Sequence, residues 1–457
     1  MFFPCILCVP WFTFFVPMSD KHHYRQKFER IADQTLFPVL EPGTQSFVRK
    51  QACYYRFTLQ ELRQITEYAN DLKMWGGEQI EDTWPSIKHG SQEIRQQKKL
   101  LMKHIDQEWE QQRQQPNRYP AHKEQRQLPL KAEVSVARKE QLGLGFCPVA
   151  SPKTRCCNLL TLDAVDNCGY GCSYCSIQSF FTGNEVTFDS HFSEKLKQIP
   201  IDPERIYHIG TGQSSDSLMW GNSNGVLDAI IDFAGDHPNV ILELKSKSAN
   251  ISHLLKSELP PNLICSWSLN PQTVIDNEEH GSAALQKRLD AARQLAANGA
   301  VIGFHFHPMI HYQQWREDYA EIFQQIQQSF TPQQVAMISL GTLTFIKPVI
   351  KKIRQQGFSS QILKMPMVEA DGKLSYPDDI KLEMFSHAYG SFSREWREQV
   401  FFYLCMENQR LWKPVFGHKY ASNDEFEQAM KSSYMHKVEV CKNSRRDRET
   451  GIEINHR

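Results

Sequence analysis

Three cysteines with the spacing C-x3-C-x2-C constrain this chain more than any other feature of its sequence. Cys168, Cys172 and Cys175 directly follow an apolar run that predicts a strand. A structural zinc site is normally closed by four ligands, whereas this loop provides three. Gly169 and Gly171 lack side chains, so the backbone can come close to a bulky inorganic centre. We interpret the loop as a site for a 4Fe-4S cluster with one iron that has no protein ligand; a zinc knuckle is the alternative.

Composition sets modest limits on function. The 457 residues suffice for two or three domains, and Lys+Arg and Asp+Glu are both 52, so net charge favours neither nucleic acid nor membrane as a partner. The 12 cysteines have no regular spacing and do not resemble a secreted disulfide framework. Because a thiolate-bound cluster needs a reducing compartment, we expect a cytoplasmic protein with no membrane association.

The first part of the sequence divides into an apolar leader and a polar, helical region. Residues 1–17 contain three prolines and no basic start, unlike a signal peptide, so we interpret them as an over-extended start with Met18 as the initiator. A weak membrane anchor is the alternative. Residues 18–141 are expected to form a mostly helical region and linker, including a capped helix over Thr58–Leu72. The basic residues within 91–127 are interleaved with acids, which favours a solvated helix over a nucleic-acid surface.

After residue 141, short apolar runs alternate with amphipathic segments. This alternation predicts a parallel sheet built from βα units, and we assign residues 142–410 as a partial (β/α)6-type barrel in an α/β protein. Chemistry in such barrels lies at the carboxyl ends of the strands, where the cysteine loop is expected. Residues 411–457 are expected to form a basic C-terminal tail. The predicted strands are Asn158–Val165, Arg205–Gly210, Val240–Leu244, Leu263–Leu269, Ala300–Phe306, Val335–Ser339 and, as a further candidate, Gln361–Met365; the predicted helices include Ser282–Ala297 and Gln313–Gln328.

Four further segments follow the cysteine loop in a specific order. They are residues 209–218 (Ile-Gly-Thr-Gly-Gln-Ser-Ser-Asp-Ser-Leu), 243–255 (Glu-Leu-Lys-Ser-Lys-Ser-Ala-Asn-Ile-Ser-His-Leu-Leu), 266–271 (Ser-Trp-Ser-Leu-Asn-Pro) and 303–315 (Gly-Phe-His-Phe-His-Pro-Met-Ile-His-Tyr-Gln-Gln-Trp). With the C-x3-C-x2-C loop, these segments resemble the spore photoproduct lyase family of radical SAM proteins. The resemblance spans residues 142–410 and implies a radical SAM barrel.

The resemblance implies a cofactor site with two components. Cys168, Cys172 and Cys175 would ligate the 4Fe-4S cluster, and S-adenosylmethionine (SAM) would chelate its open iron. Tyr174, at the aromatic position before the third cysteine, would act catalytically in a radical relay.

Three polar residues at the ends of successive predicted strands would contact SAM. Lys247 would pair with its carboxylate, while Ser215 and Ser268 would place hydroxyl groups nearby, which suits a ligand with a carboxylate, an amine and ribose hydroxyls. Taken singly, Ser215 also fits a helix N-cap, Lys247 a solvated charge and Ser268 a turn. Their shared position at strand ends favours the SAM site.

The implied activity is that of a radical SAM enzyme. SAM would be cleaved reductively to a 5′-deoxyadenosyl radical, which abstracts hydrogen from the substrate. The namesake of the family acts on a thymine dimer in spore DNA, so the resemblance points to a carbon-carbon lyase that repairs a DNA pyrimidine photoproduct. The implied partners are damaged DNA and an electron donor such as flavodoxin or ferredoxin, and we expect a monomer.

The chain departs from the namesake at two positions. Gln213 stands where the namesake has a hydrogen-donating cysteine, and Ser176 stands where it has a relay tyrosine. Cys405, in an apolar run that we predict to be helical, is the other candidate for a hydrogen-donating thiol. One alternative is therefore a radical SAM enzyme with a non-DNA substrate. Another is a nucleic-acid-binding protein with a structural iron-sulfur or zinc centre, but such a centre has no use for Lys247.

Overall fold

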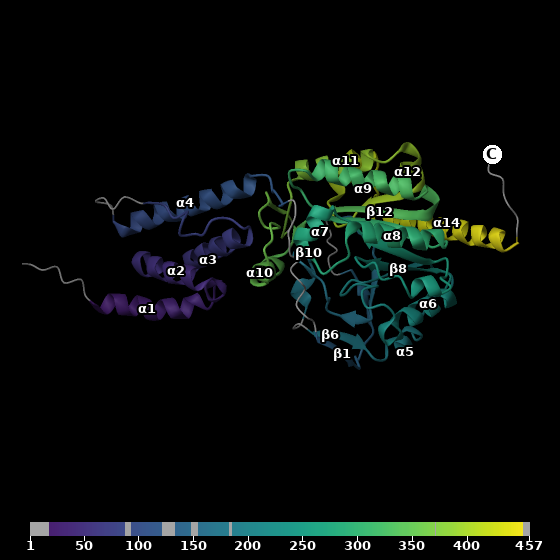
Figure 1. Cartoon of the computed structure of the whole chain (residues 1–457), viewed down its shortest axis with the longest axis horizontal. Helices are drawn as coiled ribbons and strands as arrows, with labels where there is room; N and C mark the ends of the chain where they lie inside the picture. The colour runs from purple at the N-terminus through teal and green to yellow at the C-terminus, as the bar shows by residue number, and fades with distance from the viewer. Residues whose placement is uncertain are drawn as a thin grey trace, which may run out of the picture. The chain divides into compact units, whose positions relative to one another are not determined.

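The computed structural model describes residues 18–86, 93–120, 133–147, 154–181, 185–370 and 372–450. The chain divides into two compact units, Met1–Gln112 and Arg113–Arg457 (Figure 1). The predicted leader at residues 1–17 and part of the predicted linker lie outside the described residues. Within the ranges that are described, no helix combines the length and apolar character needed to cross a bilayer.

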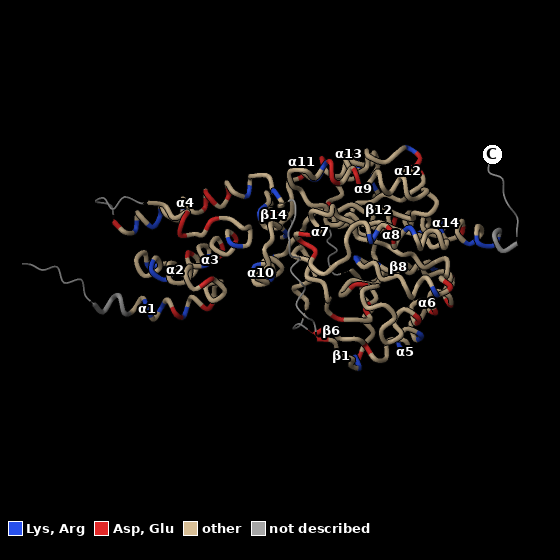
Figure 2. The backbone as a smooth tube through the Cα atoms, in the orientation of Figure 1, with Lys and Arg blue, Asp and Glu red and all other residues tan. Residues whose placement is uncertain are grey.

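The first unit is helical, and its best-defined helix is the one predicted over Thr58–Leu72. The Thr58 hydroxyl accepts a hydrogen bond from the Glu61 N–H at 3.3 Å, and the Glu61 carboxylate accepts one from the Thr58 N–H at 2.7 Å. This reciprocal pair is a capping box, so the helix prediction is confirmed. Charged residues of both signs lie along the backbone of this unit (Figure 2). Its helices are α1 (Met18–Ala32), α2 (Pro42–Tyr55), α3 (Leu59–Met74) and α4 (Ile94–Gln114).

An eight-stranded open sheet forms the centre of the second unit. Its strands are parallel except the edge strand β2, which runs antiparallel to β3. The predicted strands from 158–165 through 335–339 are confirmed, and the sheet is a partial rather than a closed barrel. In spatial order the strands are β16 (Phe401–Leu404), β12 (Val335–Thr342), β11 (Val301–Met309), β9 (Leu263–Ser268), β8 (Val240–Ser246), β7 (Tyr207–Thr211), β3 (Leu160–Asp163) and β2 (Gly143–Phe146).

Two expectations for the later part of the chain are wrong. Gln361–Met365 forms turns and bends instead of a strand. The apolar run before Cys405 is not helical but forms the parallel strand β16, which pairs with β12. Both runs are too short for periodicity to separate strand from helix, so their neighbours decide their conformation.

Helices connect the strands and cover the sheet (Figure 1). Among them, α6 packs against β8, α8 against β9 and β11, and α11 against β12. Most of the segment expected to be a basic tail is part of this unit, because α14 packs against β8, β11, β12 and β16. The helices are α5 (Phe192–Leu196), α6 (Val226–Asp236), α7 (Gln272–Glu278), α8 (Leu285–Ala297), α9 (Trp315–Ser329), α10 (Lys347–Gln355), α11 (Asp378–Gly390), α12 (Arg394–Gln399), α13 (Trp412–Phe416) and α14 (Asn423–Thr450).

Three small sheets complete the second unit. The two-stranded one carries part of the cysteine loop, because Cys172 on β5 lies opposite Glu279 on β10. The three sheets are β1 (Glu133–Ala137) with β6 (Glu185–Asp189) and β4 (Val165–Asp166); β5 (Gly171–Cys172) with β10 (Glu279–His280); and β13 (Thr344–Phe345) with β15 (Lys373–Ser375) and β14 (Val368–Ala370).

The two ends of the open sheet are linked by contacts between residues before β3 and residues after β16. Thr154 and Asn408 form an isolated antiparallel bridge. The Arg155 guanidinium donates to two backbone carbonyls on the β16 side, at 3.1 and 2.6 Å. We call these two segments, residues 154–158 and 405–427, the seam. The two ends of the sheet are not paired as strands, and the hydrogen bonds of the seam connect them instead.

Candidate functional site

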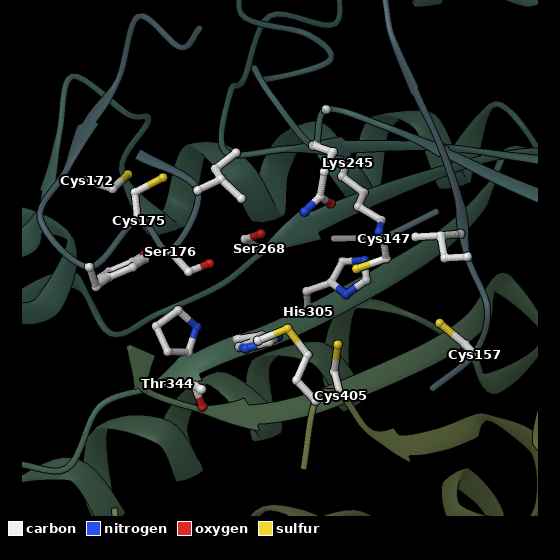
Figure 3. A pocket seen from close by; sticks show the side chains of 18 of the residues that line it. Cys147, Cys157, Cys172, Cys175, Ser176, Lys245, Ser268, His305, Thr344 and Cys405 are labelled. Atoms are coloured by element: carbon white, nitrogen blue, oxygen red, sulfur yellow. The ribbon is translucent and has the colours of Figure 1, made fainter. Parts of the chain in front are cut away.

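A cavity of about 280 Å³ lies where the parallel strands end. Strand ends far apart in the sequence contribute to its wall, as expected for a sheet of parallel strands. Figure 3 shows Cys172 and Cys175 on one side of this cavity and Cys147, Cys157 and Cys405 on the other. The lining includes every residue predicted for the site: Cys168, Cys172, Tyr174, Cys175, Ser215, Lys247 and Ser268.

The cysteine loop is fixed by backbone contacts on both sides. The Tyr170 N–H donates to the Cys168 sulfur at 3.5 Å, and the Ser173 N–H donates to the Glu278 carbonyl at 2.9 Å. A Cβ at Gly169 would lie 2.6 Å from the terminal methyl of Met219. A side chain at position 169 would therefore have to displace the flexible end of Met219, while the close approach of a cofactor stays a prediction from the sequence.

The three thiols suit a cluster better than a single ion. In the part of the chain that the structure describes, no three His, Cys, Asp or Glu side chains are arranged to hold one metal ion. A 4Fe-4S cluster is larger than an ion and takes thiolates at separate corners, and Cys168, Cys172 and Cys175 all line one cavity. Burial raises the pKa of Cys168 to about 12 and also raises those of Cys172 and Cys175, so metal binding would have to displace their protons.

A buried carboxylate, Glu279, organises the wall behind the cysteine loop. The Arg288 Nη2 donates to Glu279 Oε2 at 2.5 Å, and both side chains are fully buried. Glu279 Oε1 accepts hydrogen bonds from the Tyr174 hydroxyl and from Asn270 Nδ2, the latter at 2.9 Å. Burial opposes the charge of Glu279, but Arg288 and then Lys247 hold its pKa far below the usual value. The carboxylate therefore stays ionised at neutral pH.

Lys247 lines the cavity beside Glu279 and Tyr174. Its Nζ lies 3.7 Å from Glu279 Oε1 and 5.4 Å from the centre of the Tyr174 ring, and 16% of its side chain remains exposed. Because Arg288 already compensates Glu279, the Lys247 ammonium is not fully used by that carboxylate. Burial and Glu279 raise the pKa of Tyr174 well above its usual value, so this hydroxyl stays protonated and supports the wall. A relay role for Tyr174 stays a prediction.

Glu278 ties the cysteine loop to two distant segments. Its Oε1 accepts hydrogen bonds from the Tyr119 hydroxyl and the Gln361 N–H, both at 2.9 Å. Its Oε2 accepts from the Ser360 hydroxyl at 2.6 Å and from the hydroxyl of Ser173 in the cysteine loop. Four donors thus satisfy one fully buried carboxyl group, and the loop is supported from behind.

Asp216 holds together the two segments that carry Ser215 and Lys247. Its Oδ1 accepts from the Ser246 hydroxyl at 2.8 Å and from the N–H of Leu218 at 2.9 Å, and its Oδ2 accepts from the Lys247 N–H at 2.6 Å. Neither Asp216 nor the pair Glu279 and Arg288 was among the residues predicted from sequence. For Asp216, the one signal in the sequence was an aspartate that directly follows two serines in the segment 209–218.

Replacing Asp216 with alanine is expected to lower the free energy of unfolding by about 2–4 kcal/mol, because several buried donors lose their acceptor. Asp216→Asn keeps an acceptor oxygen and should cost less. The comparison is made by denaturant unfolding of both variants and the wild type. Equal losses for the two substitutions would show that charge, not hydrogen bonding, determines the role of this residue.

The two serines are held differently. The Ser215 hydroxyl accepts a hydrogen bond from the Trp220 indole N–H at 3.3 Å. The Ser268 carbonyl accepts one from Arg288 Nη1 at 2.8 Å, which fixes the end of β9 while the residue lines the cavity. The structure thus brings both serines to one cavity with Lys247, and their contact with SAM stays a prediction.

Comparison with known proteins identifies the region that carries this site. Residues 159–376 match the family model described as spore photoproduct lyase. These residues are similar to the spore photoproduct lyase family. They include all the predicted site residues of the chain.

The spore photoproduct lyase relatives match part of the chain. The enzyme of Geobacillus sp. (strain Y412MC61) is 26% identical over 179 residues, which are 38% of this chain and 51% of that protein. The enzyme of Bacillus subtilis (strain 168) is 31% identical over 160 residues, 34% of this chain and 47% of that protein. The chain spans about half the length of the curated relatives it matches.

Solved structures that show similarity to this chain include a spore photoproduct lyase complexed with dinucleoside spore photoproduct. It has a TM-score of 0.49 and 20% sequence identity, and the match covers 62% of this chain and 88% of that one. SuiB of Streptococcus suis bound to S-adenosylmethionine has a TM-score of 0.35 and 10% identity, over 83% of this chain and 70% of that one.

Proposed function

We propose that this chain is a radical SAM enzyme of the spore photoproduct lyase type. Cys168, Cys172 and Cys175 would hold the 4Fe-4S cluster, and the strand ends that carry Ser215, Lys247 and Ser268 would bind SAM. One observation carries this proposal: these six residues, from four separate segments, line a single cavity. When bound, the cluster and SAM would supply a 5′-deoxyadenosyl radical for hydrogen abstraction from the substrate.

The residues of the chain would orient SAM and protect it from solvent. The Lys247 ammonium would pair with the SAM carboxylate, since Glu279 is already compensated by Arg288. The hydroxyls of Ser215 and Ser268 would hydrogen-bond the polar groups of SAM. The Lys247 N–H and the Ser268 carbonyl are held by buried partners before the ligand arrives, which reduces the entropy that binding must overcome.

For the substrate we propose a DNA pyrimidine photoproduct, with damaged DNA as the partner. We propose a protein of the flavodoxin or ferredoxin type as the electron donor. We further propose that the protein acts as a monomer in the reducing cytoplasm. The match of residues 159–376 to the spore photoproduct lyase family model supports this substrate. Gln213 favours a second candidate, a radical SAM reaction on a non-DNA substrate. Gln213 lines the cavity where the namesake of the family has its hydrogen-donating cysteine, and an amide has no comparably weak bond to hydrogen.

The test is anaerobic reconstitution followed by incubation with SAM and dithionite. We expect about four irons and four sulfides per chain and release of 5′-deoxyadenosine. Bound zinc, or a complete cluster that never cleaves SAM, would contradict the proposal. Oligonucleotides that carry spore photoproduct then distinguish the two candidate substrates. Recovery of intact thymines would show repair of DNA. Turnover of SAM without such recovery would support the non-DNA candidate.

A further inference from the structure

The wall of the cavity opposite the cluster cysteines holds a second group of thiols. Cys147, Cys156, Cys157 and Cys405 all line the cavity, and none of them is in a disulfide. Figure 3 shows Cys147, Cys157 and Cys405 near Lys245, away from Cys172 and Cys175. None of these four thiols has a part in the proposed SAM site.

These thiols come from the two ends of the open sheet. Cys147 follows β2 and Cys156 and Cys157 precede β3, whereas Cys405 directly follows β16 at the other end. The seam brings the two ends together at this place: Thr154 bridges to Asn408, and the Cys156 N–H donates to Asn423 Oδ1 at 3.2 Å. Thiols on opposite sides of a hydrogen-bonded seam thus face one cavity.

The surroundings favour ionisation of one member of the group. A hydrogen bond from the Cys157 thiol lowers the pKa of Cys156 to about 6, which makes Cys156 the best nucleophile of the four. The pKa of Cys405 is raised by burial and by Cys147, and Lys245 and Cys156 are also close enough to affect it. The buried Lys245 has its own pKa raised by Glu243 and by the thiols of Cys157 and Cys405, which outweigh the effect of burial. An ammonium beside these sulfurs stabilises a thiolate during exchange.

We propose that Cys156 and Cys405 form a redox-active dithiol that closes into a disulfide across the seam, at the wall of this cavity. The oxidant is a small disulfide of the glutathione class. This second redox site does not rest on the proposed function, because thiol exchange needs neither the cluster nor SAM.

The exchange runs in two balanced steps. The Cys156 thiolate attacks one sulfur of the small disulfide, forms a mixed disulfide and releases one small thiolate. The Cys405 sulfur then attacks the Cys156 sulfur, the bond to the small thiol breaks, and the Cys405 proton leaves with the second small thiol. Two protein thiols are oxidised, and one small disulfide is reduced to two small thiols. Dithiothreitol would reverse both steps.

The disulfide would replace a hydrogen-bonded contact by a covalent one. In the reduced protein the seam is held by the Thr154–Asn408 bridge and by Arg155. In the oxidised protein the two ends of the sheet could no longer separate at the cavity wall. The cavity would therefore respond to the thiol-disulfide balance of its surroundings.

The test treats the reconstituted full-length protein with oxidised glutathione under anaerobic conditions. After alkylation and trypsin digestion, we expect a dithiothreitol-sensitive link between the peptide beginning at Cys156 and the peptide containing Cys405. Free-thiol titration should show a loss of two thiols per chain. Fragmentation spectra assign the linked sulfur among Cys156, Cys157 and the cluster cysteines of the same peptide.

Serine variants distinguish the proposed pair from its neighbours. Cys156→Ser and Cys405→Ser should each remove the link, whereas Cys147→Ser and Cys157→Ser should keep it. Cys441→Ser is the matched control, because Cys441 lies on α14 outside the cavity lining. The proposal is overturned if wild type loses no thiols, if the link persists in Cys405→Ser, or if it maps to Cys147, Cys157 or a cluster cysteine.

Discussion

Cys172→Ala is expected to abolish cluster binding and, with it, all formation of 5′-deoxyadenosine. Cys172 lies in the short pairing of β5 with β10 and is the most deeply placed thiol of the loop, at 8% exposure. A cluster with two remaining thiolates has no stable protein attachment, so iron content should fall to background. Iron, sulfide and visible absorbance are measured after reconstitution, and the nucleoside is quantified after incubation with SAM and dithionite.

Cys265→Ala is the matched control for this loss. Cys265 is fully buried in β9, so the substitution removes a comparable volume without removing a group from the cavity. This variant should bind iron like the wild type. If Cys172→Ala retained iron while Cys265→Ala lost it, the assignment of the cluster to the C-x3-C-x2-C loop would fail.

Glu279→Ala is expected to lower the free energy of unfolding by about 3–5 kcal/mol, the largest effect on stability that we predict. The substitution leaves the Arg288 guanidinium as a fully buried charge without its carboxylate. It also removes the acceptor of the Tyr174 hydroxyl. Denaturant unfolding followed by circular dichroism measures the loss.

A double variant tests whether the buried charge causes that loss. Glu279→Ala combined with Arg288→Met removes both charges and should recover part of the stability, because the uncompensated guanidinium is gone. If the two substitutions simply add, the ion pair does not explain the effect.

The contribution of Glu279 should also depend on pH in a defined direction. Its pKa in the folded protein is lowered by Arg288 and Lys247 despite burial, so its stabilising effect is fully present above the pKa of the unfolded chain, about 4.3. The difference in stability between wild type and Glu279→Ala should stay constant near neutral pH. It should shrink as the pH falls below about 4, because the carboxylate then binds a proton on unfolding.

The strands and the cysteine loop could be predicted because their signals are local. Val240–Ser246 and Val301–Met309 are apolar runs long enough to be recognised without their partners. The position of Cys172 after the first parallel strand follows from the order of strands alone. Lys247 and Ser268 are assigned to the same site by the family resemblance, which agrees with the meeting of the carboxyl ends of parallel strands at one edge.

The supporting network could not be predicted in the same way. Arg288 has the sequence setting of any arginine in an amphipathic helix, and only the packing of α8 brings it within 2.5 Å of Glu279. The run Gln361–Met365 buries Ile362 and Leu363 as an apolar strand would, yet the Gln361 N–H bonds the Glu278 carboxylate instead of a neighbouring strand. The contact between Arg288 and Glu279 and the conformation of Gln361–Met365 therefore both depend on contacts between separate segments of the chain.

The hydrogen bond from Tyr119 to Glu278 limits where a truncated form of this protein can begin. Tyr119 lies 40 residues before the family match begins at residue 159, yet it shares its carboxylate acceptor with Ser173 of the cysteine loop. Asn117 adds a second anchor, since its Nδ2 donates to the Gln361 carbonyl at 3.0 Å. A shortened gene designed from sequence similarity alone would delete both anchors and leave the cysteine loop without the hydrogen bonds that support it. An expression fragment of the second unit should therefore begin ahead of Asn117.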